Sequence, residues 1–459
     1  MTAFARQLYL AGPAWLQDVL LSAYGLRLRY LRSGPIRSRT LAGLRRSQWL
    51  GGEELRQLQL TRLTDVVAHA RETVPLYRER DLPAIAFTDL SELQQIPILR
   101  KDELRAPRAT LVSERYEARC LLAIHTGGTT GKPLTIHCDR ATLQRNYAFF
   151  ARFREWAGIP CGARVATFAG RTIVPPGQSR PPFWRRNMTA NTLLFSSYHI
   201  AAATLPAYVN ALARWQPALI DSYPSSLAPV ARYILERGIE TIRPRAVITS
   251  SETLMPEIRR DIELAFRCRV FDHYGAAEMA ALVTQCEAGS YHVNPEFGVV
   301  ELLRDGKPVE TPGELGEIVA TGFINPVMPL IRYATGDLAA WGGGASHCPC
   351  GRAFPTLERI EGRMDDVLVT PEGRLIGRLD PIFKAVGSLY ETRIVQDGPD
   401  HVRVEVVVAG AFPETERQTL LHELSDRMGP SMRIDLIEVP RIPRTAAGKF
   451  QAVSRIRLS

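Results

Sequence analysis

Hydrophobic positions follow a helical spacing in the first part of the chain. Between residues 51 and 82 the apolar positions follow a helical period, at Leu55, Leu58, Leu60, Leu63, Val66, Val67 and Ala70. This spacing predicts an amphipathic helix, which Pro75 is expected to end. Residues 1–50 are also expected to be helical.

The pattern changes between residues 121 and 300, where short apolar runs alternate with helical segments. The runs occupy residues 121–124, 164–168, 218–222 and 246–249. Helical periodicity separates them, as in residues 205–215 and 227–237. This alternation is typical of βα units, so an α/β fold is expected.

Beyond about residue 300 the pattern favours strands with Gly-rich turns between them, for example over residues 298–303, 317–321 and 366–370. The last stretch predicts strand, strand, helix and strand, at residues 391–396, 402–409, 414–428 and 433–439. We therefore expect a large N-terminal α/β region of several subdomains over residues 1–362. A small C-terminal α+β lid domain is expected over residues 363–459.

The composition is that of an ordinary globular protein. Of the 459 residues, 45% are hydrophobic and 23% are charged, which excludes disordered and fibrous classes. The longest apolar run near the start, residues 19–26, is far shorter than the ~20 residues of a membrane span, so none is expected. The start lacks a signal-peptide pattern, and seven cysteines are too few for a disulfide framework. These features favour a cytoplasmic protein.

The positive charge is concentrated at one end of the chain. The net charge is +9, and residues 1–46 carry eight arginines against a single acid, Asp18. Such a segment is suited to nucleic acid or to an anionic surface. No zinc-finger, homeodomain or RNA-binding pattern accompanies it, so we expect no nucleic-acid partner. We favour a basic helical extension over residues 1–50 that faces solvent or a partner.

A segment rich in glycine and threonine, Thr126 to Pro133, has the composition of a phosphate-binding loop. Its backbone N–H groups, hydroxyls and Lys132 suit a polyphosphate, although an ordinary turn is the alternative. It is not a Walker A loop, because only three residues separate two of its glycines and Pro133 follows the lysine. Residues 134–137 predict a strand, so the loop is expected to join two strands.

Two further motifs combine glycine with an acidic residue. In residues 273–278, Tyr274 can stack on a base and Glu278 can hold Mg²⁺ between phosphates. In residues 332–337, Asp337 follows a glycine and can accept the hydroxyls of a ribose. A strand end with a surface acid and a β-turn are the respective alternatives.

Two charged turns lie in the last hundred residues. Residues 362–367 fall where the pattern changes, which favours a hinge. Residues 443–450 contain Lys449 after a glycine. Lysine is rare here, five against 52 arginines, so this one can mark a mobile cation for a phosphoryl–acyl transition state, with chance as the alternative.

The order of these five motifs resembles the adenylate-forming superfamily of acyl-CoA synthetases and peptide-synthetase adenylation domains. Within it the chain is most similar to the phenylacetate-CoA ligase branch, which includes CapK-like proteins. Supporting segments are residues 74–78, 96–101, 223–226 and 348–352. The resemblance covers about residues 60–459. It implies an ATP- and Mg²⁺-dependent, AMP-forming ligase that activates an aryl or other small carboxylic acid as an acyl-adenylate.

The resemblance also implies a role for each matched residue. The ATP phosphates would be held by Thr126, Gly127, Gly128, Thr129, Thr130, Gly131 and Lys132. Adenine would lie near Ser251, Glu252, Tyr274 and Gly275. Asp337 and Arg363 would bind the ribose, Glu278 would bind Mg²⁺, Asp365 would be the hinge, and Lys449 would contact the carboxylate and the α-phosphate. Thr130, Lys132, Glu278 and Lys449 would then be the catalytic residues.

The acid and its acceptor are less defined. The acid pocket would include Tyr198 and Tyr223, and nearby aromatics (Phe183, Trp184, Phe195) favour a planar acid unless they are core residues. Residues 369–377 lack the Gly-rich segment of the typical ligase branch, so CoA and an amine both remain candidate acceptors. A non-catalytic nucleotide-binding relative is the other alternative, but Glu278, Asp337 and Lys449 are all retained.

Four residues form a candidate zinc site. Cys286 and His292 are followed by Cys348 and Cys350, a Cys₃His set that suits tetrahedral Zn²⁺. Reduced cysteines at a turn are the alternative, and His347 is an alternative to His292. The resemblance implies a structural zinc in comparable loops, and four protein ligands leave no open position for catalysis.

Overall fold

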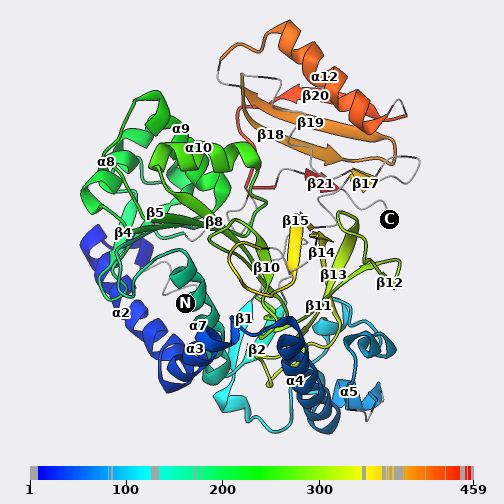
Figure 1. Ribbon diagram of the computed structural model, residues 1–459. Helices are drawn as coiled ribbons and strands as arrows, with labels where there is room; N and C mark the ends of the chain where they lie inside the picture. Colours follow the sequence, from blue (N-terminus) through cyan, green and yellow to red (C-terminus); the bar gives the residue numbers. More distant parts are fainter. Residues whose placement is uncertain are drawn as a thin grey trace. The chain divides into compact units, whose positions relative to one another are not determined.

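The protein is described by a computed structural model with two compact units (Figure 1). The first comprises Met1–Thr335 and Ala339–Arg359, and the second comprises Gly336–Leu338 and Ile360–Ser459. The structure describes residues 9–80, 82–83, 86–125, 134–169, 172–175, 177–275, 277–343, 348–363, 368–369, 371, 375–376, 386, 388–408, 410–429, 431–444, 450–451 and 453–455.

A sheet of 13 strands forms the centre of the fold. Its α/β half contains β3 (Val165–Ala169), β4 (Trp184–Asn187), β5 (Thr192–Ser196), β6 (Leu219–Ser222), β7 (Ala246–Ser250) and β8 (Arg269–Gly275). Its second half contains β9 (Leu282–Gln285), β10 (Tyr291–Val293), β11 (Gly298–Arg304), β12 (Lys307–Pro308), β13 (Leu315–Gly322), β14 (Tyr333–Trp341) and β15 (Thr356–Arg363). The strand order is β12-β11-β13-β14-β15-β10-β9-β8-β7-β6-β3-β5-β4.

The α/β half confirms the predicted fold class. Strands β5, β3, β6, β7 and β8 are parallel, and β4 pairs antiparallel at the edge. Helices α8 (Leu205–Trp215), α9 (Pro224–Glu236) and α10 (Pro256–Phe266) share a core with one face of these strands, and α7 (Arg140–Trp156) packs on the other. Burial on both faces explains why the strands are continuous apolar runs.

The sheet continues through the point where the sequence pattern changes. Strand β8 pairs antiparallel with β9, so the strands beyond residue 300 extend the same sheet. Elsewhere, β1 (Leu122–His125) and β2 (Thr135–Cys138) are the two strands expected on either side of the Gly/Thr-rich segment, and they pair antiparallel.

The N-terminal helices pack against the first unit. They are α2 (Ala14–Arg32), α3 (Pro35–Ser47), α4 (Gly52–Thr73) and α5 (Pro75–Glu79). Helix α4 ends before Pro75 as predicted, and a new helix begins there because proline is favoured at the first helical position. Short helices follow: η1 (Leu90–Gln95), η2 (Glu103–Arg105), α6 (Arg108–Leu111), η3 (Ala118–Cys120) and η4 (Ser197–His199). Among the helices that the structure describes, none is long and apolar enough to cross a membrane.

A buried ion pair ties α3 to α7. Arg152 on α7 contacts both carboxylate oxygens of Glu296, at 2.6 and 3.1 Å, and both side chains are at most 1% exposed. The guanidinium also donates to the Asn294 side chain (2.6 Å) and to the Leu44 carbonyl on α3 (3.2 Å). Ser47 donates to Glu296 Oε1 at 2.7 Å. The basic extension is therefore part of the fold of the first unit.

The second unit is the α+β module expected at the C-terminus. It contains β16 (Leu368–Val369), β17 (Leu375–Ile376), β18 (Leu389–Gln396), β19 (His401–Val408), α12 (Glu414–Met428), β20 (Arg433–Glu438) and β21 (Val453–Arg455). Four of these strands form a sheet of order β20-β19-β18-β21, and α12 packs on it through Leu420, Leu424 and Met428. The short β21, parallel to β18, was not anticipated.

Candidate functional site

The predicted site residues of the first unit gather at the carboxyl ends of its parallel strands. These strands are in register, with Phe168 opposite Ser222 and Ser250 opposite His273. Tyr223 follows β6, Ser251 and Glu252 follow β7, and Tyr274 and Gly275 close β8. In open α/β sheets this edge is where ligands bind.

The strand order reverses at β3, which is the topological switch point of the sheet. From β3 the chain passes to β4 and β5 on one side, and it later enters β6 on the other side. Loops diverge at such a switch point and leave a crevice between them. Tyr223 lies here, because its N–H donates to the Phe168 carbonyl at 3.2 Å. Tyr198 follows β5 within η4 and is exposed.

Glu252 fixes the geometry of this edge. One carboxylate oxygen accepts from the Ser225 N–H at 3.0 Å and the other accepts from the Ser225 hydroxyl at 2.9 Å. Ser225 is in the first turn of α9, where a carboxylate is favourable against the helix dipole. Glu252 therefore links the loop after β7 to the helix after β6, a positioning role that the sequence does not reveal.

Ser251 has a left-handed backbone, with φ of 71°. For a residue with a side chain this conformation costs about 1–3 kcal/mol and persists only where neighbouring structure enforces it. The backbone on either side of Ser251 is held in place: Ser250 ends β7, and Glu252 is bonded to Ser225. Strain of this kind is concentrated at ligand-binding segments.

Glu278 is joined to a motif that is distant in the sequence. The buried Tyr333 hydroxyl donates to Glu278 Oε1 at 3.2 Å. Tyr333 begins β14, which also carries Asp337. The contact joins Glu278 to Tyr333 of the third motif, and the tyrosine orients a partly exposed carboxylate of the type that binds Mg²⁺.

The start of β14 is held by a residue that we did not single out. Arg332 is buried and forms a two-point ion pair with Glu301, at 2.8 and 3.0 Å. It also donates to the Ile96 carbonyl at 2.7 Å. Its guanidinium therefore binds groups of the protein, and Arg332 holds in place the start of the strand that carries Tyr333.

Two titratable residues precede Tyr274 on β8, the buried Asp272 and the half-buried His273. Asp272 accepts from the hydroxyls of Thr249 (2.6 Å) and Tyr291 (2.8 Å), and burial raises its pKa to about 6. His273 packs edge-on against Phe150 and a second phenylalanine of α7, and burial lowers its pKa to about 4. Its Nδ1 has no hydrogen-bond partner among the described residues. The imidazole is therefore neutral at pH 7.

The aromatic residues expected near the acid pocket are divided between core and surface. Phe183 and Phe195 are buried, and Phe195 stacks on Phe168 with ring centroids 4.6 Å apart. They are core residues and give no support to a planar substrate. Tyr198 and Tyr223 remain at the edge where the pocket is expected.

Several predicted residues lie outside the part of the chain that the structure describes. They are Thr126, Gly127, Gly128, Thr129, Thr130, Gly131, Lys132, Asp365 and Lys449. Arg363 ends β15, and its side chain is likewise not described. Asp337 belongs to the short segment of β14 assigned to the second unit. Their roles remain predictions.

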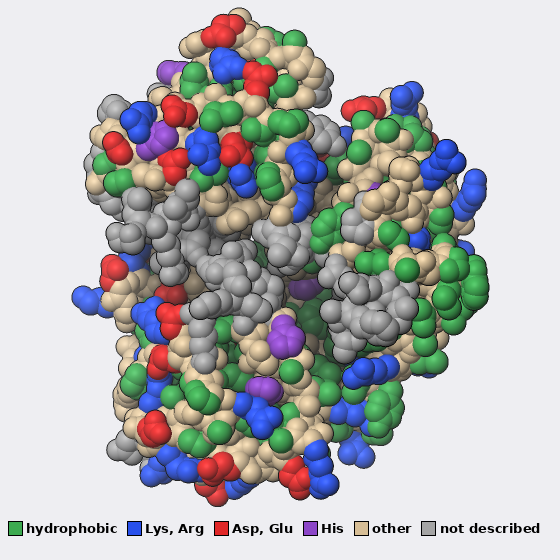
Figure 2. Space-filling model, turned by 180° about the vertical axis from the view of Figure 1, so that it is seen from behind, with side chains coloured by type: hydrophobic (Ala, Val, Ile, Leu, Met, Phe, Trp, Pro, Cys, Tyr) green, Lys and Arg blue, Asp and Glu red, His purple; other side chains and the backbone are tan. Residues whose placement is uncertain are grey.

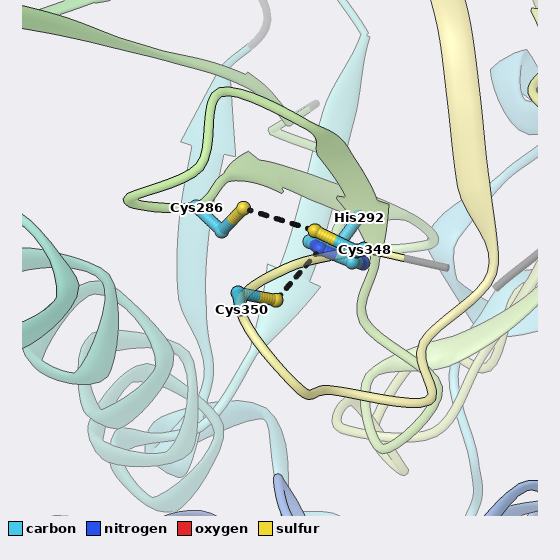
Figure 3. A group of neighbouring side chains, drawn as sticks. All are labelled: Cys286, His292, Cys348 and Cys350. Carbon is cyan, nitrogen blue, oxygen red and sulfur yellow. Dashed lines mark hydrogen bonds between the residues drawn. The ribbon is translucent and has the colours of Figure 1, made fainter. Parts of the chain in front are cut away.

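Figure 3 shows the four predicted zinc ligands directed toward one another. Cys286 follows β9 and His292 lies on β10, while Cys348 and Cys350 precede β15. The ligand atoms all lie within 4.8 Å of one another, with Cys286 Sγ 3.6 Å from Cys348 Sγ and Cys350 Sγ 3.3 Å from His292 Nε2. His347 is not among the described residues.

The surroundings of this cluster fit a metal. His292 Nδ1 donates to the Phe354 carbonyl at 3.2 Å, which leaves Nε2 as the lone-pair nitrogen facing the sulfurs. Cys286 is buried, and burial raises the pKa of its thiol to about 12. Without a cation, a thiolate at Cys286 is therefore unfavourable, and bound Zn²⁺ would reverse that preference. The residues fit the expected zinc site.

The chain is similar to proteins of known name along most of its length. The family of the CapK C-terminal domain matches residues 368–455. Protein CapK of Staphylococcus aureus is 28% identical over 416 residues, covering 88% of this chain and 90% of the relative. Phenylacetate-coenzyme A ligase of Thermus thermophilus is 24% identical over 445 residues, covering 88% of this chain and 97% of the relative.

A solved structure shares the fold. It is 2-hydroxyisobutyryl-CoA ligase in its postadenylation state, with a TM-score of 0.72, 21% identity, and coverage of 90% of this chain and 92% of the other. The resemblance inferred from the motifs is thereby confirmed. Along most of its length the chain is similar to CapK and to the phenylacetate-CoA ligases, and its motifs resemble those of the adenylate-forming superfamily.

Proposed function

We propose that this protein is an ATP-dependent, AMP-forming ligase that activates a small carboxylic acid as an acyl-adenylate and transfers the acyl group to CoA. The observation that carries the proposal is the convergence of Tyr223, Ser251, Tyr274 and Glu278 around the carboxyl edge of the parallel strands. The relatives named as phenylacetate-CoA ligases supply the reaction class. We expect the enzyme to act in the cytoplasm.

The first half-reaction joins the substrate carboxylate to the α-phosphorus of ATP and releases pyrophosphate. Its developing charges are all anionic, so fixed cations and N–H donors stabilise the transition state. Glu278, oriented by Tyr333, is the residue that would hold Mg²⁺, which would neutralise phosphate charge. Lys449 is proposed to contact the carboxylate and the α-phosphate, while residues 126–132 hold the other phosphates.

The second half-reaction transfers the acyl group. The CoA thiolate attacks the acyl carbonyl, and the C–O bond to the adenylate breaks to release AMP. Residues 369–377 lack the Gly-rich segment of the typical ligases, and an amine acceptor is therefore the competing proposal. The relatives named for coenzyme A favour the thioester.

Pyrophosphate exchange tests the first half-reaction. Acid-dependent exchange between ATP and labelled pyrophosphate is measured with a panel of aryl and short aliphatic acids. Glu278→Gln and Lys449→Ala should each lower exchange by about 10²-fold or more, because each removes a preorganised charge. The matched control is Glu310→Gln, an exposed carboxylate after β12. ATP binding without exchange for any acid would overturn the proposal.

A chase experiment separates the two acceptors. The acyl-adenylate is formed first, CoA or a set of amines is added separately, and AMP release is timed. Faster release with CoA supports the thioester. Faster release with an amine would replace CoA as acceptor while leaving adenylation intact.

We also propose that Cys286, His292, Cys348 and Cys350 hold a structural Zn²⁺. Support comes from the Cys₃His donor set, of which Cys286 and His292 are buried, and from the fixed tautomer of His292. The metal would join the β9–β10 hairpin to the segment before β15, two parts of the sheet separated by 62 positions in the sequence. Such a site stabilises the fold rather than the transition state.

A further inference from the structure

Helix α2 is oriented with its apolar side outward. Its buried residues are Gln17, Ser22 and Gly25, all polar or small. Its exposed residues include large apolar side chains: Trp15, Val19, Leu20, Tyr24, Leu26 and Tyr30, with Trp15 67% and Tyr30 63% exposed. At 100° per residue these side chains occupy one half of the helix. Surface helices normally bury their apolar half.

The polar half is inside because it completes the edge of the sheet. Strand β4 is the last strand, and the N–H of Arg186 donates to Asp18 at 2.8 Å. The N–H of Met188, just beyond β4, donates to the Ser22 hydroxyl at 3.0 Å. Inside the fold, Gln17 accepts from the buried Arg185. Rotating α2 to bury its apolar side would break these contacts.

Close approach at Gly25 also fixes the rotation of α2. A Cβ atom at this position would lie 2.5–2.6 Å from side-chain atoms of Asn187 and Thr189. A larger residue does not fit between the helix and the strand end. The apolar half of α2 is therefore held outward by the fold, and Figure 2 shows hydrophobic side chains gathered along this flank, at the right of the view.

The chemistry of this face matches the interface of a lipid bilayer. Tryptophan and tyrosine combine an apolar ring with a polar group, and with leucine and valine they are typical of helices that lie in the headgroup region. The same helix carries the exposed Arg27 and Arg29, and its only acid, Asp18, is already engaged by β4. A helix that carries such charges lies parallel to the membrane surface, in the headgroup region.

The charge distribution decides among the candidate occupants. The described residues 9–46 contain seven arginines and one acid. A second copy of the chain would bring the same positive segment against itself, which is unfavourable, whereas anionic headgroups are complementary. We propose that α2 docks this protein on an anionic membrane surface through its exposed apolar half and its exposed arginines, Arg27 and Arg29.

Vesicle flotation tests the proposal on the full-length protein. The vesicles are phosphatidylcholine alone or phosphatidylcholine with phosphatidylglycerol. The protein should float with the anionic vesicles, less so at high salt. The double variant Val19→Gln, Leu26→Gln should weaken binding at least about ten-fold, because two apolar side chains no longer enter the interface. Leu264→Gln, an equally exposed leucine on α10, should bind as the unmodified protein does.

A charge variant keeps the test independent of any folding defect in the first. Arg27→Glu, Arg29→Glu should lose binding to anionic vesicles, whereas Arg260→Glu on α10 should not. Equal binding of the α2 variants and the unmodified protein would overturn the proposal, as would absence of binding to anionic vesicles. A dimer in sedimentation analysis that Val19→Gln, Leu26→Gln dissolves would assign the face to a second copy instead.

Discussion

The buried ion pair of Arg152 and Glu296 allows a measurement of how burial changes the stability cost of removing one charged partner. Replacing Arg152 with methionine keeps most of the apolar stem, so the cavity contribution is small. The carboxylate of Glu296 is then left with the Ser47 hydroxyl, and Asn294 and the Leu44 carbonyl each lose a donor. Because the pair is at most 1% exposed, we expect a loss of about 3–5 kcal/mol in the free energy of unfolding.

An exposed pair of the same length is the control. Arg45 and Glu155 are also 2.6 Å apart, but their side chains are 56% and 36% exposed. Arg45→Met should therefore lower the free energy of unfolding by less than about 1 kcal/mol. The shortest contact has the same length in the two pairs, so the difference lies in burial and in the further bonds of Arg152 to Asn294 and Leu44.

Urea unfolding followed by tryptophan fluorescence and by circular dichroism measures both changes. The double variant Arg152→Met, Glu296→Leu should be more stable than Arg152→Met alone, because no charge is then stranded in the interior. A loss below about 1 kcal/mol for Arg152→Met would refute the reasoning, and so would a double variant no more stable than the single one.

Three further predictions follow from the site. Cys350→Ser should abolish bound zinc by elemental analysis, while the exposed Cys120→Ser should retain it; equal zinc in both would refute the metal site. Tyr333→Phe should raise the Mg²⁺ concentration for half-maximal pyrophosphate exchange about 3- to 10-fold, since Glu278 loses one hydrogen bond; an unchanged Mg²⁺ requirement would argue against that role. Asp272 has a pKa of about 6 in the folded protein, so as the pH falls from about 6 to about 4 the folded state takes up its proton first and is stabilised. His273 has a pKa of about 4 in the folded protein, so over the same range the unfolded state takes up its proton first and the fold is destabilised. The two effects on the free energy of unfolding largely cancel. Asp272→Asn removes the first effect, so its urea midpoint should fall more steeply with acid than that of the unmodified protein; equal slopes would contradict the assignment.

Local periodicity was sufficient to predict many elements. Helices α8 and α12 begin and end where their apolar spacing begins and ends, and α4 stops before Pro75. These boundaries depend on residues close together in the sequence. The single 13-stranded sheet was not predicted, because the pairing of β8 with β9 and of β10 with β15 is decided by tertiary contacts.

The candidate site shows the same division. The four residues of the candidate zinc site were predicted together because a Cys₃His set suits tetrahedral Zn²⁺. The clamp of Glu252 on Ser225 and the contact of Tyr333 with Glu278 were not, since each joins loops that only the folded sheet brings together. Phe183 and Phe195 could not be assigned to pocket or core, because composition does not distinguish a lining aromatic residue from a packed one.

The contact of α2 with β4 also protects the sheet from other chains. A terminal strand with free amides is a template for pairing with another polypeptide, and the opposite edge, β12, is only two residues long. At β4 the amides of Arg186 and Met188 are occupied by α2. Removal of α2 would leave the residues at the carboxyl ends of the parallel strands in place, but it would expose the unpaired amides of β4. The helix therefore prevents aggregation by pairing of this edge strand with other chains.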